Sequence, residues 1–117
     1  MTRFFCGKHS YCRRGNGRAL RKAMSNIKRY YAIVGLLENY DVYLQILNKR
    51  LPKFFPKIPL EDISKFKYNS EYKFDDISRD LIRDITRANW ADVKLYSFLK
   101  KRFWQQAKTC GIMTKLN

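Results

Sequence analysis

The sequence has few acidic residues and almost no histidine. It contains 10 Asp and Glu residues against 25 Lys and Arg residues, for a formal net charge of +15, and His9 is its single histidine. This imbalance implies an anionic partner, and nucleic acid, anionic lipid and sulfated polysaccharide all satisfy it. A histidine-centred catalytic triad could be built only around His9, and we expect a surface or hydrogen-bonded role for that side chain instead.

Long apolar stretches and phosphate-binding motifs are also missing. No stretch approaches the roughly 20 apolar residues of a membrane-spanning helix. The first residues contain no apolar signal core, so the chain as given carries no secretory address or anchor. The sequence has neither a GxxxxGK(S/T) loop nor a Rossmann glycine fingerprint. Its 117 residues have the length of one domain, and their ordinary hydrophobic content argues against disorder throughout.

Three cysteines are present, Cys6, Cys12 and Cys110. Five residues separate the first two, and Gly7 assists a turn, so a small disulfide-closed loop is one interpretation. Free thiols are a second. A zinc site on Cys6, His9 and Cys12 is a third, although no further ligand pair completes a tetrahedral set.

Residues 30–55 form the stretch around which the chain is organised. The unbroken apolar run at 31–37 predicts a strand buried on both faces, as in a parallel sheet. A helix follows between the capping candidate Asn39 and Pro52, with an apolar stripe at helical spacing: Tyr40, Tyr43, Leu44, Leu47 and Leu51. The predicted fold class is therefore α/β, although the rest of the chain does not obviously supply neighbouring strands.

Three further helices and a basic loop are expected. Residues 18–29 have an apolar face with a basic rim, which is either simply solvated or a polyanion-binding face. A helix capped by Asp76 or Ser78 comes later, and a last helix spans about 92–108 before Gly111, with Leu95, Phe98, Leu99 and Phe103 as its buried stripe. Residues 61–76 mix lysines, aromatics and small polar residues, and form either a plain basic loop or one that grips phosphate.

Several of these pieces, in order, resemble the C-terminal third of the heparan sulfate and uronyl 2-O-sulfotransferases. The segment 4–12, FFCGKHSYC, resembles the FCGHxxxC element of that family, and 19–26 resembles the helix after it. The run 31–38 resembles the hydrophobic VGxxE strand, 51–55 resembles LPRFF, and 95–98 with 102–103 resembles the final helix. The similarity covers nearly the whole chain.

The resemblance implies a fold, a reaction and a location. It implies the mostly helical C-terminal portion of a P-loop-like α/β sulfotransferase fold, with a Cys6–Cys12 disulfide and Cys110 free. The family transfers a sulfuryl group from 3'-phosphoadenylyl sulfate to the 2-hydroxyl of a uronic acid in a glycosaminoglycan. Its full-length members are anchored in the membrane and act in the Golgi lumen. The resemblance implies no metal, implies a uronic-acid or sulfated polysaccharide as partner rather than nucleic acid, and leaves a homo-oligomer of the full-length protein open.

Within this resemblance the chain divides into a cysteine loop (1–17), a helix–strand–helix unit (18–55), a nucleotide-covering loop (56–76) and C-terminal helices (77–117). The hydroxyl-x-x-lysine pair of the family falls on Ser70 and Lys73, with Asn69 as a neighbouring nucleotide contact. Lys65 and Lys67 are candidates for binding the polysaccharide or the 3'-phosphate side.

The chain also departs from the family pattern. The family's phosphosulfate-binding loop, catalytic histidine and main 3'-phosphate ligands lie upstream of the FCG element, which begins here at Phe5. A sulfuryl transfer needs a base for the acceptor hydroxyl and a positive group for the leaving phosphate. We therefore expect a partial sulfotransferase domain that has no catalytic residues of its own and is inactive in isolation.

Overall fold

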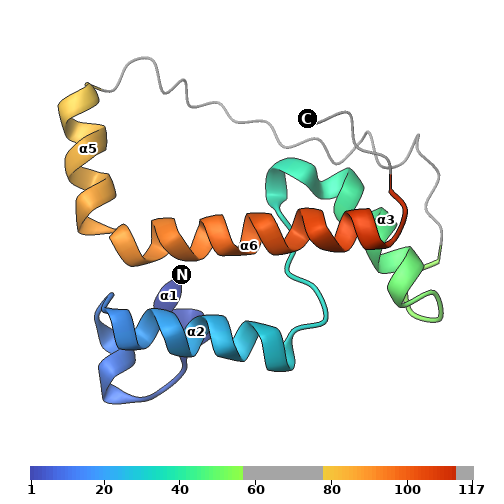
Figure 1. Cartoon of the computed structure of the whole chain (residues 1–117), viewed down its shortest axis with the longest axis horizontal. Helices are drawn as coiled ribbons and strands as arrows, with labels where there is room; N and C mark the ends of the chain where they lie inside the picture. Colours follow the sequence, from blue (N-terminus) through green and yellow to red (C-terminus); the bar gives the residue numbers. More distant parts are fainter. Residues whose placement is uncertain (57–77, 113–117) are drawn as a thin grey trace. The chain divides into compact units, whose positions relative to one another are not determined.

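The computed structural model describes residues 1–56 and 78–112 of the 117. Their regular structure is helical: α1 (Thr2–Cys6), η1 (Ser10–Arg13), α2 (Gly17–Tyr30), η2 (Leu37–Asn39), α3 (Tyr40–Arg50), α5 (Arg79–Ala88) and α6 (Trp90–Thr109) (Figure 1). These described residues group into two compact units, one of residues 1–32 and 78–99 and the other of 33–56 and 100–112. Helix α6 contributes its first half to one unit and its second half to the other. No described helix is long and apolar enough to cross a membrane.

The predicted strand at 31–37 is not formed. Residues 31–36 have no regular secondary structure, and Leu37 begins η2. The backbone is extended at Tyr31 and at Leu36, but the described part of the chain contains no other strand with which this segment could pair. A strand owes its stability to the hydrogen-bond ladder with a neighbour, so an extended apolar run without one stays irregular. The P-loop-like sulfotransferase fold remains a prediction.

Helix α2 is formed where the apolar periodicity predicted it. Its buried residues lie on one side: Ala19, Leu20, Ala23 and Ile27. The predicted cysteine loop before it contains two short helices, α1 and η1. The hydroxyl and the backbone N–H of Thr2 in α1 donate to Asp92 of α6 at 2.6 and 2.8 Å. These bonds, together with the buried residues Ala91, Leu95 and Leu99 of α6, attach α6 to the first unit.

The second unit is built around a small apolar core. Helix α3 follows Asn39 and ends before Pro52, as predicted, although the Asn39 side chain makes no capping bond. Close packing brings Gly35 against the ring of Tyr43, and a Cβ at Gly35 would lie 2.5 Å from Tyr43 Cδ2. The buried residues of the core are Leu36, Ile46, Phe103 and Ala107, with Ile33, Val42, Tyr43, Trp104, Cys110 and Ile112 packed around them.

Helix α6 ends at Thr109, two residues before the predicted stop at Gly111. The backbone of Gly111 has φ +72°, and its N–H donates to the carbonyl of Lys108 at 3.0 Å. The N–H of Ile112 donates to the carbonyl of Ala107 at 3.0 Å, which completes the double-bonded helix termination that glycine favours at this position.

Helix α5 differs from the others because none of its residues is buried. Its start is set by Ser78, whose hydroxyl accepts from the N–H of Leu81 at 3.2 Å, so of the two caps predicted the structure uses Ser78. The apolar residues Leu81, Ile82 and Ile85 are 50, 40 and 51% exposed.

Candidate functional site

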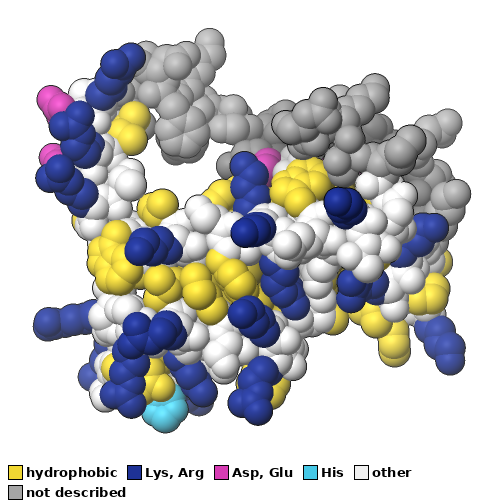
Figure 2. All heavy atoms as spheres, viewed as in Figure 1, with side chains coloured by type: hydrophobic (Ala, Val, Ile, Leu, Met, Phe, Trp, Pro, Cys, Tyr) yellow, Lys and Arg dark blue, Asp and Glu magenta, His cyan; other side chains and the backbone are white. Residues whose placement is uncertain are grey.

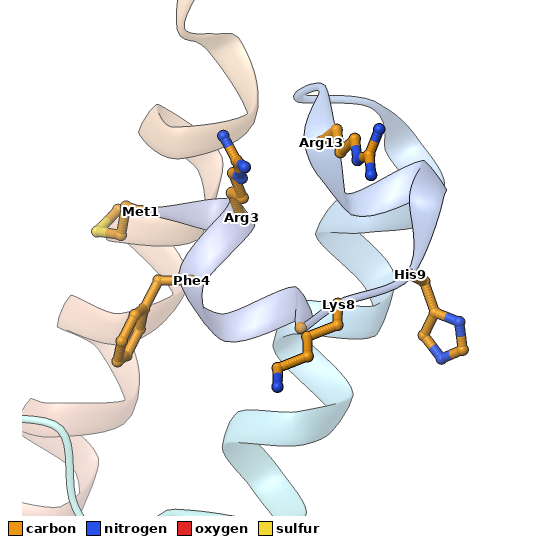
Figure 3. Close-up of a pocket in the computed structure, with 7 residues that line it drawn as sticks. Met1, Arg3, Phe4, Lys8, His9 and Arg13 are labelled. Carbon is orange, nitrogen blue, oxygen red and sulfur yellow. The ribbon is translucent and has the colours of Figure 1, made fainter.

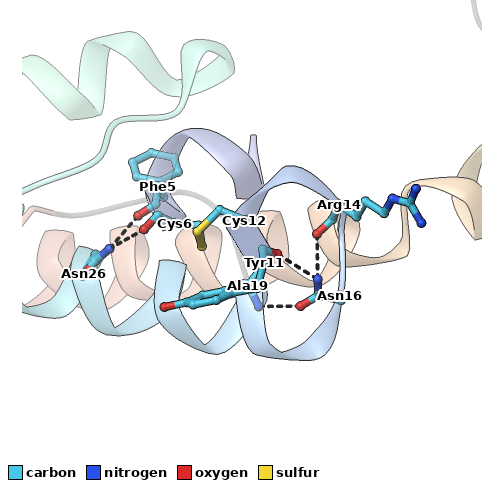
Figure 4. The surroundings of a disulfide bond; sticks show 8 residues. All are labelled: Phe5, Cys6, Tyr11, Cys12, Arg14, Asn16, Ala19 and Asn26. Atoms are coloured by element: carbon cyan, nitrogen blue, oxygen red, sulfur yellow. Dashed lines mark hydrogen bonds between the residues drawn. A yellow bond between two sulfur atoms is a disulfide. The ribbon is translucent and has the colours of Figure 1, made fainter. Parts of the chain in front are cut away.

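The cysteine loop at the start of the chain is closed by a disulfide between Cys6 and Cys12 (Figure 4). Their Cα atoms are 5.6 Å apart, and both side chains are buried at 2 and 1% exposure. Gly7 leaves α1 with φ +113°, a conformation open to glycine and rarely to other residues. Cys110, at the other end of the described chain, is free. Among the described residues, no group of three potential ligands is arranged to hold a metal ion.

Two asparagines tie this loop to helix α2. Asn26 donates to the carbonyl oxygens of Phe5 and Cys6 at 2.9 and 3.1 Å. Asn16 donates to the carbonyl oxygens of Tyr11 and Arg14 at 2.8 and 3.1 Å, and its own side-chain oxygen caps α2 by accepting from the N–H of Ala19 at 2.8 Å (Figure 4). Both ends of the loop are therefore fixed to the same helix.

An open pocket lies beside the loop, and its polar side chains are cationic. Arg3 comes from α1, Lys8 from the loop and Arg13 from η1 (Figure 3). In this view Arg3 rises from α1, Arg13 extends sideways from η1, and Lys8 points downward. The described residues that line the pocket are Met1, Arg3, Phe4, Gly7, Lys8, His9 and Arg13.

Among the described residues, no carboxylate forms an ion pair with Arg3, Lys8 or Arg13. The ion pair between the amino group of Met1 and Asp92, at 3.6 Å, involves none of these three cations. Figure 2 shows Lys and Arg side chains gathered around the single histidine, with no acidic side chain among them on that face. Guanidinium groups present paired N–H donors that match carboxylate, phosphate and sulfate oxygens. The arrangement can therefore bind an anion.

Aromatic contacts with Tyr11 fix the side chains of Arg18 and His9. The Arg18 guanidinium lies 4.0 Å from the centroid of the Tyr11 ring, and His9 stacks on Tyr11 with centroids 5.1 Å apart and planes 7° from parallel. His9 is exposed, and no described hydrogen bond to a carboxylate orients its ring. This geometry gives the His9 ring a packing role against Tyr11 rather than a role in proton transfer.

The residues predicted to bind the nucleotide and the polysaccharide belong to a segment that the structure does not describe. Asn69, Ser70 and Lys73, and likewise Lys65 and Lys67, fall outside the described residues, so their roles remain predictions. Sequence inspection missed the Arg3, Lys8 and Arg13 cluster, because these residues are five apart in sequence and counted only toward net charge. The spacing of Cys6 and Cys12 is the signal that could have revealed the cluster, because a disulfide between them brings the chain on either side together.

Curated proteins similar to this chain share one description. Human uronyl 2-sulfotransferase is 36% identical over 52 residues, which cover 44% of this chain and 13% of the human protein. The mouse protein of that name matches equally. A Drosophila uronyl 2-sulfotransferase homologue, pip, is 28% identical over 115 residues, covering 91% of this chain and 22% of the fly protein. No family model and no solved structure matches. The chain thus spans less than a quarter of the length of these relatives, and their names confirm the resemblance seen in its motifs.

Proposed function

The chain is related to the uronyl 2-sulfotransferases, and we propose that it contributes to 2-O-sulfation of a glycosaminoglycan. In this reaction a sulfuryl group passes from 3'-phosphoadenylyl sulfate to the 2-hydroxyl of a uronic acid, in the Golgi lumen. The donor would contact Asn69, Ser70 and Lys73, and the polysaccharide Lys65 and Lys67. The names of the relatives support the reaction class.

The observation that carries the assignment of substrate is the unneutralised cationic pocket. A uronic-acid polysaccharide presents a carboxylate on each uronic acid, and sulfation adds further anionic oxygens. Arg3 and Arg13 offer two guanidinium groups on a loop that a disulfide and two asparagines hold in place. Because the loop is ordered before binding, little conformational entropy is lost when the anion arrives. We assign to this pocket the binding of an acidic group of the polysaccharide.

On its own, the 117-residue chain is expected to perform no turnover. Deprotonating the acceptor hydroxyl needs a base with a tuned pKa, and the leaving phosphate needs positive groups aimed at its oxygens. His9 is exposed and stacked on Tyr11, without a described partner that would orient it as a base. A second candidate function, non-catalytic binding of heparin or another polyanion, is favoured by the same pocket and needs no base.

One experiment addresses both functions. The oxidised chain is incubated with labelled donor and 2-O-desulfated heparin, and its salt-dependent retention on heparin is measured in parallel. We expect no labelled product, and retention that weakens in the double variant Arg3→Gln, Arg13→Gln. The control is Lys100→Gln with Lys101→Gln, which removes the same charge from exposed positions of α6. Each cation that binds an anionic group should release about one counterion, so the salt dependence of the pocket variant should fall by roughly two.

The outcomes separate the claims. Labelled product would show that the chain is a complete catalyst and that its expected inactivity is wrong. Equal weakening in both variants would mean that net charge alone binds heparin, and the assignment of the pocket would fail. Retention on nucleic acid equal to that on heparin, at the same salt, would favour a general polyanion-binding protein over the polysaccharide partner.

A further inference from the structure

Helix α2 carries charge of one sign only. Its 14 residues include five cations and no acidic residue: Arg18, Arg21, Lys22, Lys28 and Arg29. At 100° per residue these five fall within one arc centred on Ser25, opposite the buried side of the helix. Four of them are exposed and Lys22 is half-buried.

Helix α5 differs from α2 in that its charges have both signs. It has three arginines, Arg79, Arg83 and Arg87, but Asp80 and Asp84 lie between them. Oppositely charged residues three and four positions apart on a helix attract, whereas like charges repel. In α2, by contrast, Arg18 faces Arg21 and Lys22 with no acid nearby in the helix. An anionic partner laid along this face would remove that repulsion.

The cationic face reaches the short helix η1, which also carries a residue of the pocket. Arg18 belongs to the face and also covers the ring of Tyr11, in the same short helix as the pocket residue Arg13. From Arg18 to Arg29 the helix rises about 16 Å, at 1.5 Å per residue. Among the described residues none of the five cations forms an ion pair. Lys28 lies 5.6 Å from the ring centroid of Phe98, which orders its amino group without neutralising it.

We propose that the exposed face of α2 is a track for a linear acidic polysaccharide, which continues from the pocket and binds several sugar units beyond it. The inference rests on the proposed function, because it takes the same substrate class and extends the site. Polysaccharide is favoured over single-stranded nucleic acid because the face offers cations without an aromatic platform. Proteins that bind single strands combine both, since bases stack on exposed rings. On α2 the one aromatic residue, Tyr30, lies at the end of the helix.

The test measures affinity against chain length. Heparin oligosaccharides from tetrasaccharide to dodecasaccharide are titrated into the wild-type chain and into Arg21→Gln, Arg29→Gln. The matched control is Arg79→Gln, Arg87→Gln, which removes two exposed arginines with the same separation from α5. Circular dichroism verifies that each variant is folded.

We expect the wild-type affinity to rise with oligosaccharide length. The α2 variant should lose about tenfold for the dodecasaccharide and less than about twofold for the tetrasaccharide, because the short chain is held by the pocket. The α5 control should change by less than about twofold for both.

Three results would overturn the inference or its premise separately. Equal losses in the α2 variant and the α5 control would show that only net charge matters, and the track would be refuted. Oligothymidylate of matched charge that binds as tightly as the dodecasaccharide, with the same loss in the α2 variant, would refute the choice of polysaccharide. Unchanged tetrasaccharide affinity in Arg3→Gln, Arg13→Gln would instead refute the pocket of the proposed function.

Discussion

Replacing Asn16 with alanine removes three hydrogen bonds in one substitution. The side chain caps α2 through the N–H of Ala19 and holds the carbonyl oxygens of Tyr11 and Arg14. Loss of an asparagine cap costs about 1 kcal/mol. Each of the two partly exposed side-chain bonds contributes about 0.5 kcal/mol. The expected decrease in the free energy of unfolding is therefore about 2 kcal/mol, and the melting temperature should fall by about 8 °C.

Two further substitutions separate the contribution of the helix cap from that of the two donated hydrogen bonds. Asn16→Asp keeps an oxygen that can cap α2 and gains attraction to the helix N-terminus, but it cannot donate to the two carbonyl oxygens. It should lose about 1 kcal/mol, half of the alanine effect, as each donated bond contributes about 0.5 kcal/mol. Asn48→Ala serves as the control, because Asn48 makes a single exposed bond to the carbonyl of Phe55 at 3.0 Å. Its loss should stay below about 0.5 kcal/mol.

Urea unfolding of the oxidised chains, followed by circular dichroism, measures the three variants. An Asn16→Ala protein as stable as the Asn48→Ala control would refute the reasoning, since the cap and the loop bonds would then contribute nothing. Equal losses for the alanine and aspartate variants would assign the whole effect to the two donated bonds rather than to the cap.

Three other sites give predictions of known direction. Gly35→Ala should cost about 1–3 kcal/mol in urea unfolding, because the new methyl would lie 2.5 Å from Tyr43 Cδ2, and Tyr43→Ala in the same chain should relieve part of that clash. The hydroxyl of Thr2 donates to Asp92 and holds the pKa of that carboxyl below its ordinary value. The stability that this bond contributes is present above the unfolded pKa of about 3.9 and is lost as the pH falls through the lower pKa of the folded state. Thr2→Val should therefore make the free energy of unfolding less dependent on pH in this acid range. An unchanged pH dependence would contradict this. Gly111→Ala should cost about 1 kcal/mol in thermal unfolding because of its φ of +72°, whereas Gly111→Asn should cost less.

The helices could be predicted because a helix is specified by residues that are close together in the sequence. Apolar spacing indicated α2, α3 and α6, one of two predicted caps, Ser78, begins α5, and Gly111 follows the end of α6. Asn16 is the same kind of capping residue as Ser78, but it lies within the predicted cysteine loop and was not assigned to the start of α2.

The prediction of a strand at 31–37 was wrong because strand formation is not decided locally. An apolar run shows that a segment avoids water, but whether it becomes a strand depends on a partner elsewhere. The cationic pocket depends on distant residues as well. Arg3 and Arg13 line the same pocket because the segment between them is closed into a loop by the bond between Cys6 and Cys12.

The uncovered apolar side of α5 determines how the chain behaves in solution. With a net charge of +15, molecules at low salt repel one another before Leu81, Ile82 and Ile85 can meet. The screening length falls to about 10 Å at 0.1 M salt and to about 3 Å at 1 M, so added salt removes this repulsion. Concentrated samples should therefore cluster at high ionic strength, and Ile85→Lys, placed on the exposed side of α5, should keep them dispersed.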